Sequence, residues 1–306
     1  MEIFMEPISL ITPFAALLCA PFLLGVINRV KAIFAGRRGQ PLLLPYHIII
    51  KLFRKSAVYS TTTSWVFRAG PFIGFAAILV AVCVVPFGNF GAPVSFTGDV
   101  LLLTGLLALV RFFTVVAALD TGSPFEGMGA SREVFFSALA EPIFLVGLFS
   151  VCKGAGVISL AAVSGNLASV PVVPACLTGI GLFMVMLAEN ARIPVDDPTT
   201  HLELTMIHEV MVLDHSGPDF AFINYTGAIK LWLFTLIIAR IMLPFHSNNL
   251  FMDTILTAGA MLILTVSVGI VESIMARLRL VRVPLFLAAA FALVVLALFF
   301  GSGVIA

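Results

Sequence analysis

The sequence predicts an all-α, polytopic membrane protein with about eight transmembrane helices. Two bulk properties indicate this class: 60% of the 306 residues are apolar and only 11% are charged. Soluble domains contain about 45–50% apolar and about 25% charged residues. The third observation is a series of apolar stretches, each close to the ~20 residues that a helix needs to cross a bilayer core. They cover residues 8–28, 70–90, 98–119, 136–158, 170–189, 224–243, 251–271 and 284–303.

Short segments separate these stretches and justify their boundaries. The first stretch is followed by a basic connection in which residues 38–57, "RGQPLLLPYHIIIKLFRKSA", are too short and too basic to span. We expect this segment to be amphipathic and to lie in the membrane interface. A basic loop that only sets orientation is the alternative. A glycine-rich turn, "GNFGAP", divides the second and third stretches, and the Pro and Gly residues inside later stretches are compatible with spanning helices.

Basic residues predict the orientation of the chain. Eight lie between the first two spans, where no acid occurs: Arg29, Lys31, Arg37, Arg38, Lys51, Arg54, Lys55 and Arg68. Three more precede the last span: Arg277, Arg279 and Arg282. The opposite face carries only Lys153. Because cytoplasmic loops are enriched in Lys and Arg, we expect long cytoplasmic loops and both termini outside.

Composition also excludes several kinds of site and partner. A net charge of +1 argues against a nucleic-acid binder. The four cysteines, Cys19, Cys83, Cys152 and Cys176, are scattered, whereas iron–sulfur and c-type haem sites need clustered thiols. We therefore expect no cofactor on this chain.

Some charged residues fall inside the predicted spans. Arg111, Lys230 and Glu141 lie where a charge costs about 2.5–3.5 kcal/mol or more, so such groups are normally paired or line a wet path. A functional role is favoured for these three. Arg240 and Glu272 lie closer to span ends, and we expect their side chains to snorkel to the interface.

The stretch from Arg192 to Phe220 concentrates six acids and three histidines. A metal site is disfavoured, because "HEVMV" lacks the second histidine of H-E-x-x-H. Histidines seven residues apart also lie about 10.5 Å apart along a helix, too far to share one ion. No metal ligand is predicted.

Capping signals in the same stretch predict a helix over residues 198–215. Asp197-Pro198 and Thr200-x-x-Glu203 suit its start, and Ser216-Gly217-Pro218 suits its end. On that helix His201, His208 and His215 would form one stripe, with Glu203 and Asp214 on the other side. Capping explains part of the pattern, and a proton-handling element is the interpretation for the rest.

Three segments carry a family resemblance: "GRRGQPLLLPYHIIIKLFRK", "ALDTGSPFEGMGASREVFFSALAEP" and "AENARIPVDDPTTHLELTMIHEVMVLDHSG". They resemble the membrane subunit of group 4 energy-converting [NiFe] hydrogenases, the formate hydrogenlyase subunit 4 and hydrogenase 4 component C family. That family is homologous to the complex I membrane subunit that roofs the quinone chamber. The resemblance covers essentially residues 1–306, which implies a single membrane domain of the complex I subunit 1 type.

The resemblance implies a non-catalytic anchor of an oxidoreductase complex in the cell (inner) membrane. The chain would link electron transfer in a hydrophilic arm to translocation of protons or Na⁺. Its expected partners are the [NiFe] hydrogenase large subunit, the iron–sulfur small subunit and antiporter-like membrane subunits. The [NiFe] centre and the [4Fe–4S] clusters would lie in those partners.

Residue roles follow from matches to the family motifs. Arg132 and Glu141 meet the pattern G-A-x-R followed by Glu, and Glu189, Arg192 and Asp196 meet Glu-x-x-Arg-x-Pro-x-Asp. The residues assigned to a proton or ion path are Glu141, Glu189, Asp196, Glu203, Asp214, Lys230 and Arg111. Those assigned to docking or coupling loops are Arg37, Arg38, Asp120, Glu126, Arg132, Glu133, Arg192, His201, His208, Glu209 and His215. No catalytic residue is predicted.

Two other functions compete with this interpretation. A quinone-binding subunit of a complex-I-like NADH:quinone oxidoreductase is the alternative, but "DPTTHLE" stands where complex I has a glutamate-rich run. A free-standing transporter that uses Lys230 is disfavoured, because the polar residues are concentrated on one side of the membrane, as a docking face requires.

Overall fold

The eight predicted spans are present as eight long apolar helices in the computed structural model, which describes residues 7–88, 90–166, 170–197, 206–243 and 249–301. The spanning helices are α1 (Ile11–Phe34), α3 (Trp65–Val84), α4 (Asp99–Asp120), α5 (Pro124–Ala155), α7 (Val172–Glu189), α9 (Gly217–Met242), α10 (Leu250–Ile274) and α11 (Val283–Gly301). The shorter helices are η1 (Pro7–Leu10), α2 (Leu44–Phe53), α6 (Leu160–Asn166), α8 (His208–Met211) and η3 (Leu280–Arg282). The all-α membrane class is therefore confirmed.

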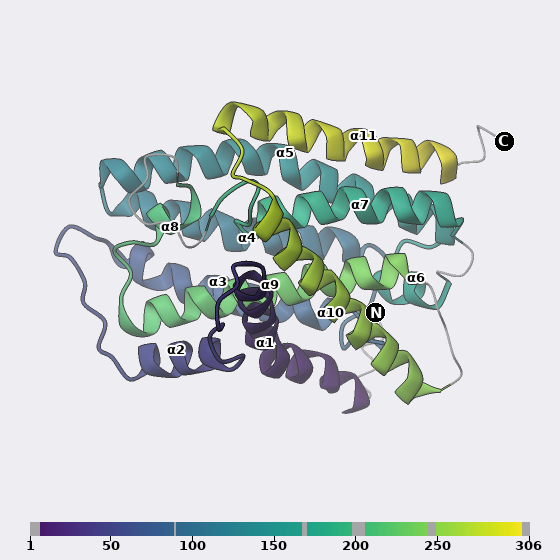
Figure 1. Cartoon of the computed structure of the whole chain (residues 1–306), viewed down its shortest axis with the longest axis horizontal. Helices are drawn as coiled ribbons and strands as arrows, with labels where there is room; N and C mark the ends of the chain where they lie inside the picture. Colours follow the sequence, from purple (N-terminus) through teal and green to yellow (C-terminus); the bar gives the residue numbers. More distant parts are fainter. Residues whose placement is uncertain (1–6, 89, 167–169, 198–205, 244–248, 302–306) are drawn as a thin grey trace.

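Helix α9 forms the centre of the bundle and packs against α1, α3, α7 and α10. Helix α11 lies along α5 and α7, and α10 crosses the bundle obliquely (Figure 1). The connection between α2 and α3 lies with α2 and α8 at one end of the bundle, which we call the α8 end (Figure 1). Helix α6 lies at the opposite end (Figure 1). The cytoplasmic orientation of the α8 end stays a prediction from charge.

Three spans, α3, α5 and α9, begin at least five residues earlier than their hydropathy predicts, and for two of them a local signal explains the start. Helix α3 begins at Trp65 because Ser64 caps it, with its hydroxyl accepting a hydrogen bond from the Val66 amide at 3.2 Å. Helix α5 begins at Pro124, a residue suited to the first helical turn, instead of at residue 136. At 1.5 Å per residue its 32 residues extend about 48 Å, well beyond a hydrocarbon core of about 30 Å. Its first turns therefore present polar residues at the α8 end.

Two other helices donate hydrogen bonds to backbone carbonyls of α1 near a proline. Pro21 has no amide proton, so the Leu17 carbonyl lacks its usual donor within the helix. The Tyr225 hydroxyl of α9 donates to that carbonyl at 2.5 Å, and the Tyr46 hydroxyl of α2 donates to the carbonyl of Leu18. Side chains from distant segments thus satisfy the backbone near the proline, as spanning helices require.

Candidate functional site

Arg111, on α4, is the centre of a buried charged cluster. Its side chain is 6% exposed and its guanidinium meets three carboxylates. Its Nε lies 3.3 Å from Glu133, and its two terminal nitrogens pair with Glu141 and Glu189. Arginine suits this position because its donors point in three directions from one rigid plane.

Lys230, on α9, completes this charged cluster. Its ammonium lies 2.9 Å from the Glu189 carboxylate and donates to the Glu189 backbone carbonyl at 2.6 Å. Because α9 begins at Gly217, Lys230 lies near the middle of the helix and not close to its start. Two cations and three carboxylates from α4, α5, α7 and α9 therefore meet within the bundle. Charges inside the spans were predicted to be paired or to line a wet path, and Arg111, Lys230 and Glu141 are directly paired.

Glu133 was grouped with the docking loops on sequence, and the structure places it in the charged cluster instead. Hydropathy places the start of this span at residue 136, so Glu133 falls outside it. In α5, Glu133 and Glu141 are eight residues apart, a spacing that leaves them about 80° apart around the helix. Recognising Pro124 as a helix start would have placed both acids on one helix.

A cavity of about 170 Å³ lies on the α8 side of the charged cluster. Its floor includes Arg111, Glu133, Glu189 and Lys230, and its wall includes Gly70 and Gly74 of α3. Three residues assigned to the coupling loops also line it: His208, Glu209 and His215. The cavity joins titratable side chains of the loop after α7 to the cluster.

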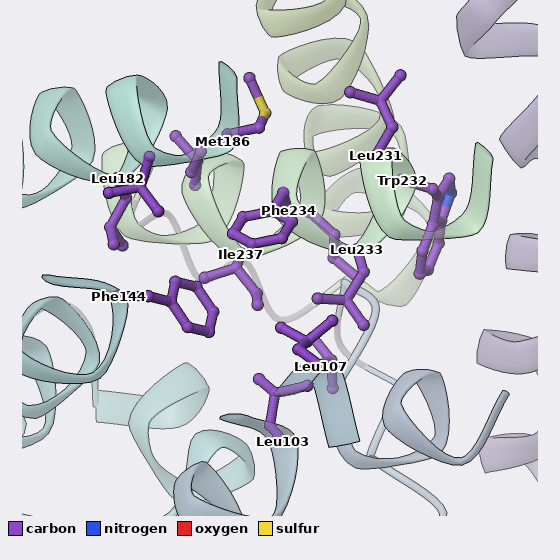
Figure 2. Packing of buried hydrophobic residues seen from close by; sticks show 14 of the residues in the cluster. Leu103, Leu107, Phe144, Leu182, Met186, Leu231, Trp232, Leu233, Phe234 and Ile237 are labelled. Atoms are coloured by element: carbon purple, nitrogen blue, oxygen red, sulfur yellow. The ribbon is translucent and has the colours of Figure 1, made fainter. Parts of the chain in front are cut away.

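An apolar layer closes the other side of the charged cluster. On α4 and α7 it is made by residues before Arg111 and Glu189, and on α5 and α9 by residues after Glu141 and Lys230. Figure 2 shows these side chains converging: Leu103, Leu107, Phe144, Leu182, Phe234 and Ile237. The rings of Phe144 and Phe234 are 4.9 Å apart. The cluster is thus open to polar groups toward the α8 end and sealed toward the opposite end.

The helix predicted over residues 198–215 is wrong in the part that the structure describes. Only His208–Met211 is helical between residues 206 and 215, and His201 and Glu203 lie outside the described residues. Side chains take the backbone groups that a longer helix would use. The Asp196 carboxylate accepts from the amides of Ile207 and His208, both at 3.1 Å, and Arg132 donates to the Met206 carbonyl at 3.0 Å.

The predicted histidine stripe therefore does not form in the described part of this segment. His208 and His215 belong to separate local structures, yet both side chains face the same cavity. The ring of His215 stacks on Phe67 of α3 with centroids 4.0 Å apart and planes 4° apart. Burial lowers the pKa of His215 to about 4. Burial, and then the charge of Lys230, lowers the pKa of His208 to about 4. Both are neutral imidazoles at neutral pH.

These depressed pKa values predict a loss of stability in mild acid. The unfolded chain binds more protons than the folded chain between pH 6.5 and about 4, so stability falls as the pH falls through this window. At pH 5.5, the depressed pKa of His215 alone lowers the free energy of unfolding by about 1 kcal/mol. We expect thermal unfolding of His215→Phe to depend less on pH between 7.5 and 5.5. Phe67→Leu, which removes only the stacking partner, should lower stability but keep the slope. An unchanged slope in His215→Phe would contradict the assignment.

A second group of charges ties the loop after α7 to the end of α10. Glu272 is fully buried and pairs with Lys31 at 2.9 Å and with Arg192 at 3.2 Å. Arg277 lies 2.8 Å from the Asp196 carboxylate, and the Leu278 amide donates to the Pro194 carbonyl at 2.8 Å. Snorkelling was therefore the wrong interpretation for Glu272, because cations from α1 and from this loop reach it inside the protein.

Snorkelling was also wrong for Arg240. Its side chain is buried in α9 and donates to the Ser164 carbonyl of α6 at 3.2 Å. The end of α6 therefore covers the arginine, which sequence position alone placed near an interface.

The remaining predicted site residues lie at or near the α8 end. Arg37 and Arg38 are exposed in the loop after α1. The Asp120 carboxylate accepts from the Ser64 amide at 2.7 Å. Glu126 is buried and accepts from the Thr121 hydroxyl and from the Asp214 amide, while Asp214 itself is exposed. These contacts stabilise the segments that connect the helices. The docking and path roles of these residues stay predictions.

Comparison with known proteins places this fold and cluster in a family. A family model described as NADH dehydrogenase matches residues 7–302. The chain belongs to the NADH dehydrogenase family. Within this family it is 28% identical to formate hydrogenlyase subunit 4 of Escherichia coli (strain K12), over 87% of this chain and 88% of that protein. It is 29% identical to hydrogenase-4 component C of the same organism, over 86% and 85%.

More distant relatives complete the comparison. A subunit of the NADH-quinone oxidoreductase of Rickettsia canadensis (strain McKiel) is 24% identical, over 67% of this chain and 62% of that protein. Among solved structures, a chain of the membrane-bound sulfane sulfur reductase, an archaeal respiratory membrane complex, matches with a TM-score of 0.81 and 19% identity. It covers 96% of this chain and 98% of that chain, which shows that the two share a fold. The predicted resemblance to the hydrogenase branch is confirmed.

Proposed function

We propose that this chain is the membrane anchor and ion-coupling subunit of a membrane-bound [NiFe] hydrogenase complex of the formate hydrogenlyase or hydrogenase-4 type. Two relatives matched over most of their length, formate hydrogenlyase subunit 4 and hydrogenase-4 component C, support the complex. The cluster around Arg111 supports the coupling role. The coupled ion would be a proton or Na⁺.

The observation that carries the coupling role is the position of the cluster between a polar cavity and an apolar layer. An ion or charge reaching Glu189 from the α8 end meets Leu107, Phe144 and Phe234 beyond it. Glu141 offers a lateral way out, because its side chain is 42% exposed on the outside of the bundle. A carboxylate facing lipid at this depth is costly. A neighbouring membrane subunit with polar groups would cover it and receive the charge.

The redox cofactors of such a complex would lie in other subunits. The [NiFe] centre and [4Fe–4S] clusters would belong to a large and a small subunit of a hydrophilic arm docked at the α8 end. Antiporter-like subunits would lie beside α5 in the cell (inner) membrane. Changes at the arm would reach the cluster through the loop after α7, whose His208 and Glu209 line the cavity.

A quinone-binding function is the second candidate, supported by the relatives named as NADH-quinone oxidoreductase subunits and by the presence of a cavity. The cavity volume of about 170 Å³ lies below the ~300–1,000 Å³ usual for small-molecule sites. Its floor of charged groups suits water and ions better than a quinone ring. Labelling of the cavity wall by a photoreactive quinone analogue would favour this alternative.

Replacing Glu141 with glutamine tests the coupling role. We expect ion translocation per hydrogen molecule formed to fall at least about tenfold, because an amide cannot release or accept the proton. Hydrogenase activity with a soluble dye should persist. The measurement is the quenching of a pH- or sodium-sensitive dye in vesicles that contain the whole complex. Ser137→Ala, one turn earlier on α5, is the control. Normal translocation in both Glu141→Gln and Glu189→Gln would refute the role.

A further inference from the structure

Helix α2 is held rigidly against the bundle at the α8 end. Its buried residues, Pro45 and Ile49, face the interior, and the Tyr46 hydroxyl donates to the Leu18 carbonyl of α1. The ring of Phe53 makes an edge contact with Phe222 of α9, with centroids 5.1 Å apart. The chain just before α2 passes so close to Gly25 that a Cβ there would lie 2.0 Å from the Leu42 carbonyl oxygen. The outward face of α2 therefore has a defined position.

That outward face is apolar, and the adjoining elements also expose apolar side chains. Leu43, Ile48, Ile50 and Phe53 are each between 41% and 55% exposed. The exposed side chains Ile33 and Phe34 of α1 and Trp65 of α3 lie in the adjoining elements. Ten residues are too few to cross a bilayer, and tryptophan is enriched at membrane–water interfaces. This combination suits a helix that lies at the membrane surface with its apolar side chains among acyl chains.

The charged residues of the chain segment that contains α2 are all of one sign. No Asp or Glu occurs between Pro7 and Gly98, whereas eight Lys and Arg residues do. Three of the eight serve the fold: Lys31 pairs with Glu272, Arg29 donates to the Gly39 carbonyl, and Arg68 lies over the Tyr59 ring. The other five are exposed, and none pairs with a carboxylate within the described parts of the chain: Arg37, Arg38, Lys51, Arg54 and Lys55.

We propose that α2 and the three cations at its carboxyl end, Lys51, Arg54 and Lys55, form a binding surface for the headgroups of anionic phospholipids. The apolar side chains of α2 meet the acyl region, while these cations meet phosphate groups at the headgroup level. A lipid fits this surface better than a soluble protein, because α2 packs against the spanning helix α1, which exposes Ile33 and Phe34. The proposal is independent of the hydrogenase assignment and needs only that the chain spans a membrane.

The test uses the full-length protein, purified with its partners, in nanodiscs of phosphatidylcholine with a minor fraction of phosphatidylglycerol. It measures which of the two lipids is enriched around the natural protein and around its variants. We expect phosphatidylglycerol to be enriched in the lipid retained by the protein, and the enrichment to fall as salt is raised. We expect this enrichment to fall at least about fivefold in the triple variant Lys51→Gln, Arg54→Gln, Lys55→Gln. A fall of this size is the effect expected when one basic side chain near an anionic surface is lost. Since all three side chains are exposed, the variant should keep its helical content.

A matched control removes three exposed cations elsewhere: Lys153→Gln, Arg279→Gln and Arg282→Gln. This control should retain the enrichment. No preference for phosphatidylglycerol in the natural protein, or an equal loss in the control, overturns the proposal. Protection of Lys51 and Lys55 from an amine-reactive reagent that depends on a co-purifying soluble subunit would also overturn it, because a protein would then occupy the surface.

Discussion

Arg111→Gln is expected to lower the free energy of unfolding by about 3–5 kcal/mol, as removal of one member of a buried ion network does. The change leaves Glu133, Glu141 and Glu189 with only Lys230 as a cation. Glu133 and Glu189 are largely buried, so without Arg111 these carboxylates must be protonated, recruit water or rely on Lys230. Thermal unfolding of the detergent-purified protein should show a fall in Tm of roughly 5–15 °C.

Two further variants separate the network from loss of a charge in general. Lys153→Gln removes an exposed cation and should leave Tm nearly unchanged, as surface changes usually do. Adding Glu133→Gln to Arg111→Gln should recover part of the loss, because Glu133 pairs with Arg111 whereas Glu189 keeps Lys230 as a partner. Equal, small effects of Arg111→Gln and Lys153→Gln would show that the ion pairs do not stabilise the protein.

Glu272→Gln is expected to have an effect of similar size, again about 3–5 kcal/mol. Glu272 is the shared partner of Lys31 and Arg192, so a neutral amide leaves two cations without their carboxylate. The loop after α7 would lose its strongest tie to α10. Hydrogen exchange should therefore increase in residues 190–197 and 206–211 before the rest of the bundle is affected, in addition to a lower Tm.

The neighbouring Ser273→Ala is the control for Glu272→Gln. Its hydroxyl donates to the Gly269 carbonyl within α10 at 2.6 Å, and its loss should cost less than about 1 kcal/mol. Replacing Lys31, Arg192 and Glu272 together with methionine should recover much of the stability, because apolar groups of similar volume can replace buried ions. Local exchange that stays at the natural level in Glu272→Gln would argue against a clamp on this loop.

How well the sequence predicted each element depended on the type of interaction that determines it. Spans were predicted correctly because about 20 consecutive apolar residues are needed whatever packs against them. Helix starts were less accurate, since Ser64 and Pro124 act through local caps that a hydropathy average does not register. The helix over 198–215 failed in its described part because Asp196, just before it in the chain, and Arg132, from α5, take its backbone hydrogen bonds.

The residues of the candidate site were predicted better than the contacts between them. Arg111, Glu141 and Lys230 were recognised because a charge inside an apolar stretch needs a partner, and Glu189 was recognised from the family motif. Their actual pairing was not readable, since Arg111 and Glu189 are 78 residues apart in the chain. Glu133 was placed in the wrong group, and Glu272 and Arg240 were taken for interfacial residues although their partners lie on other helices.

By itself, the sequence determined that this protein crosses a membrane eight times, which family it resembles and which charged residues have to be explained. These follow from composition, local periodicity and motif order, all properties of contiguous residues. Only the tertiary structure decided that Arg111 joins three carboxylates, that a cavity opens toward the α8 end and that an apolar layer closes the opposite side. The reason is physical: each of these features is made by side chains from at least three helices, and their contacts exist only once the bundle has packed.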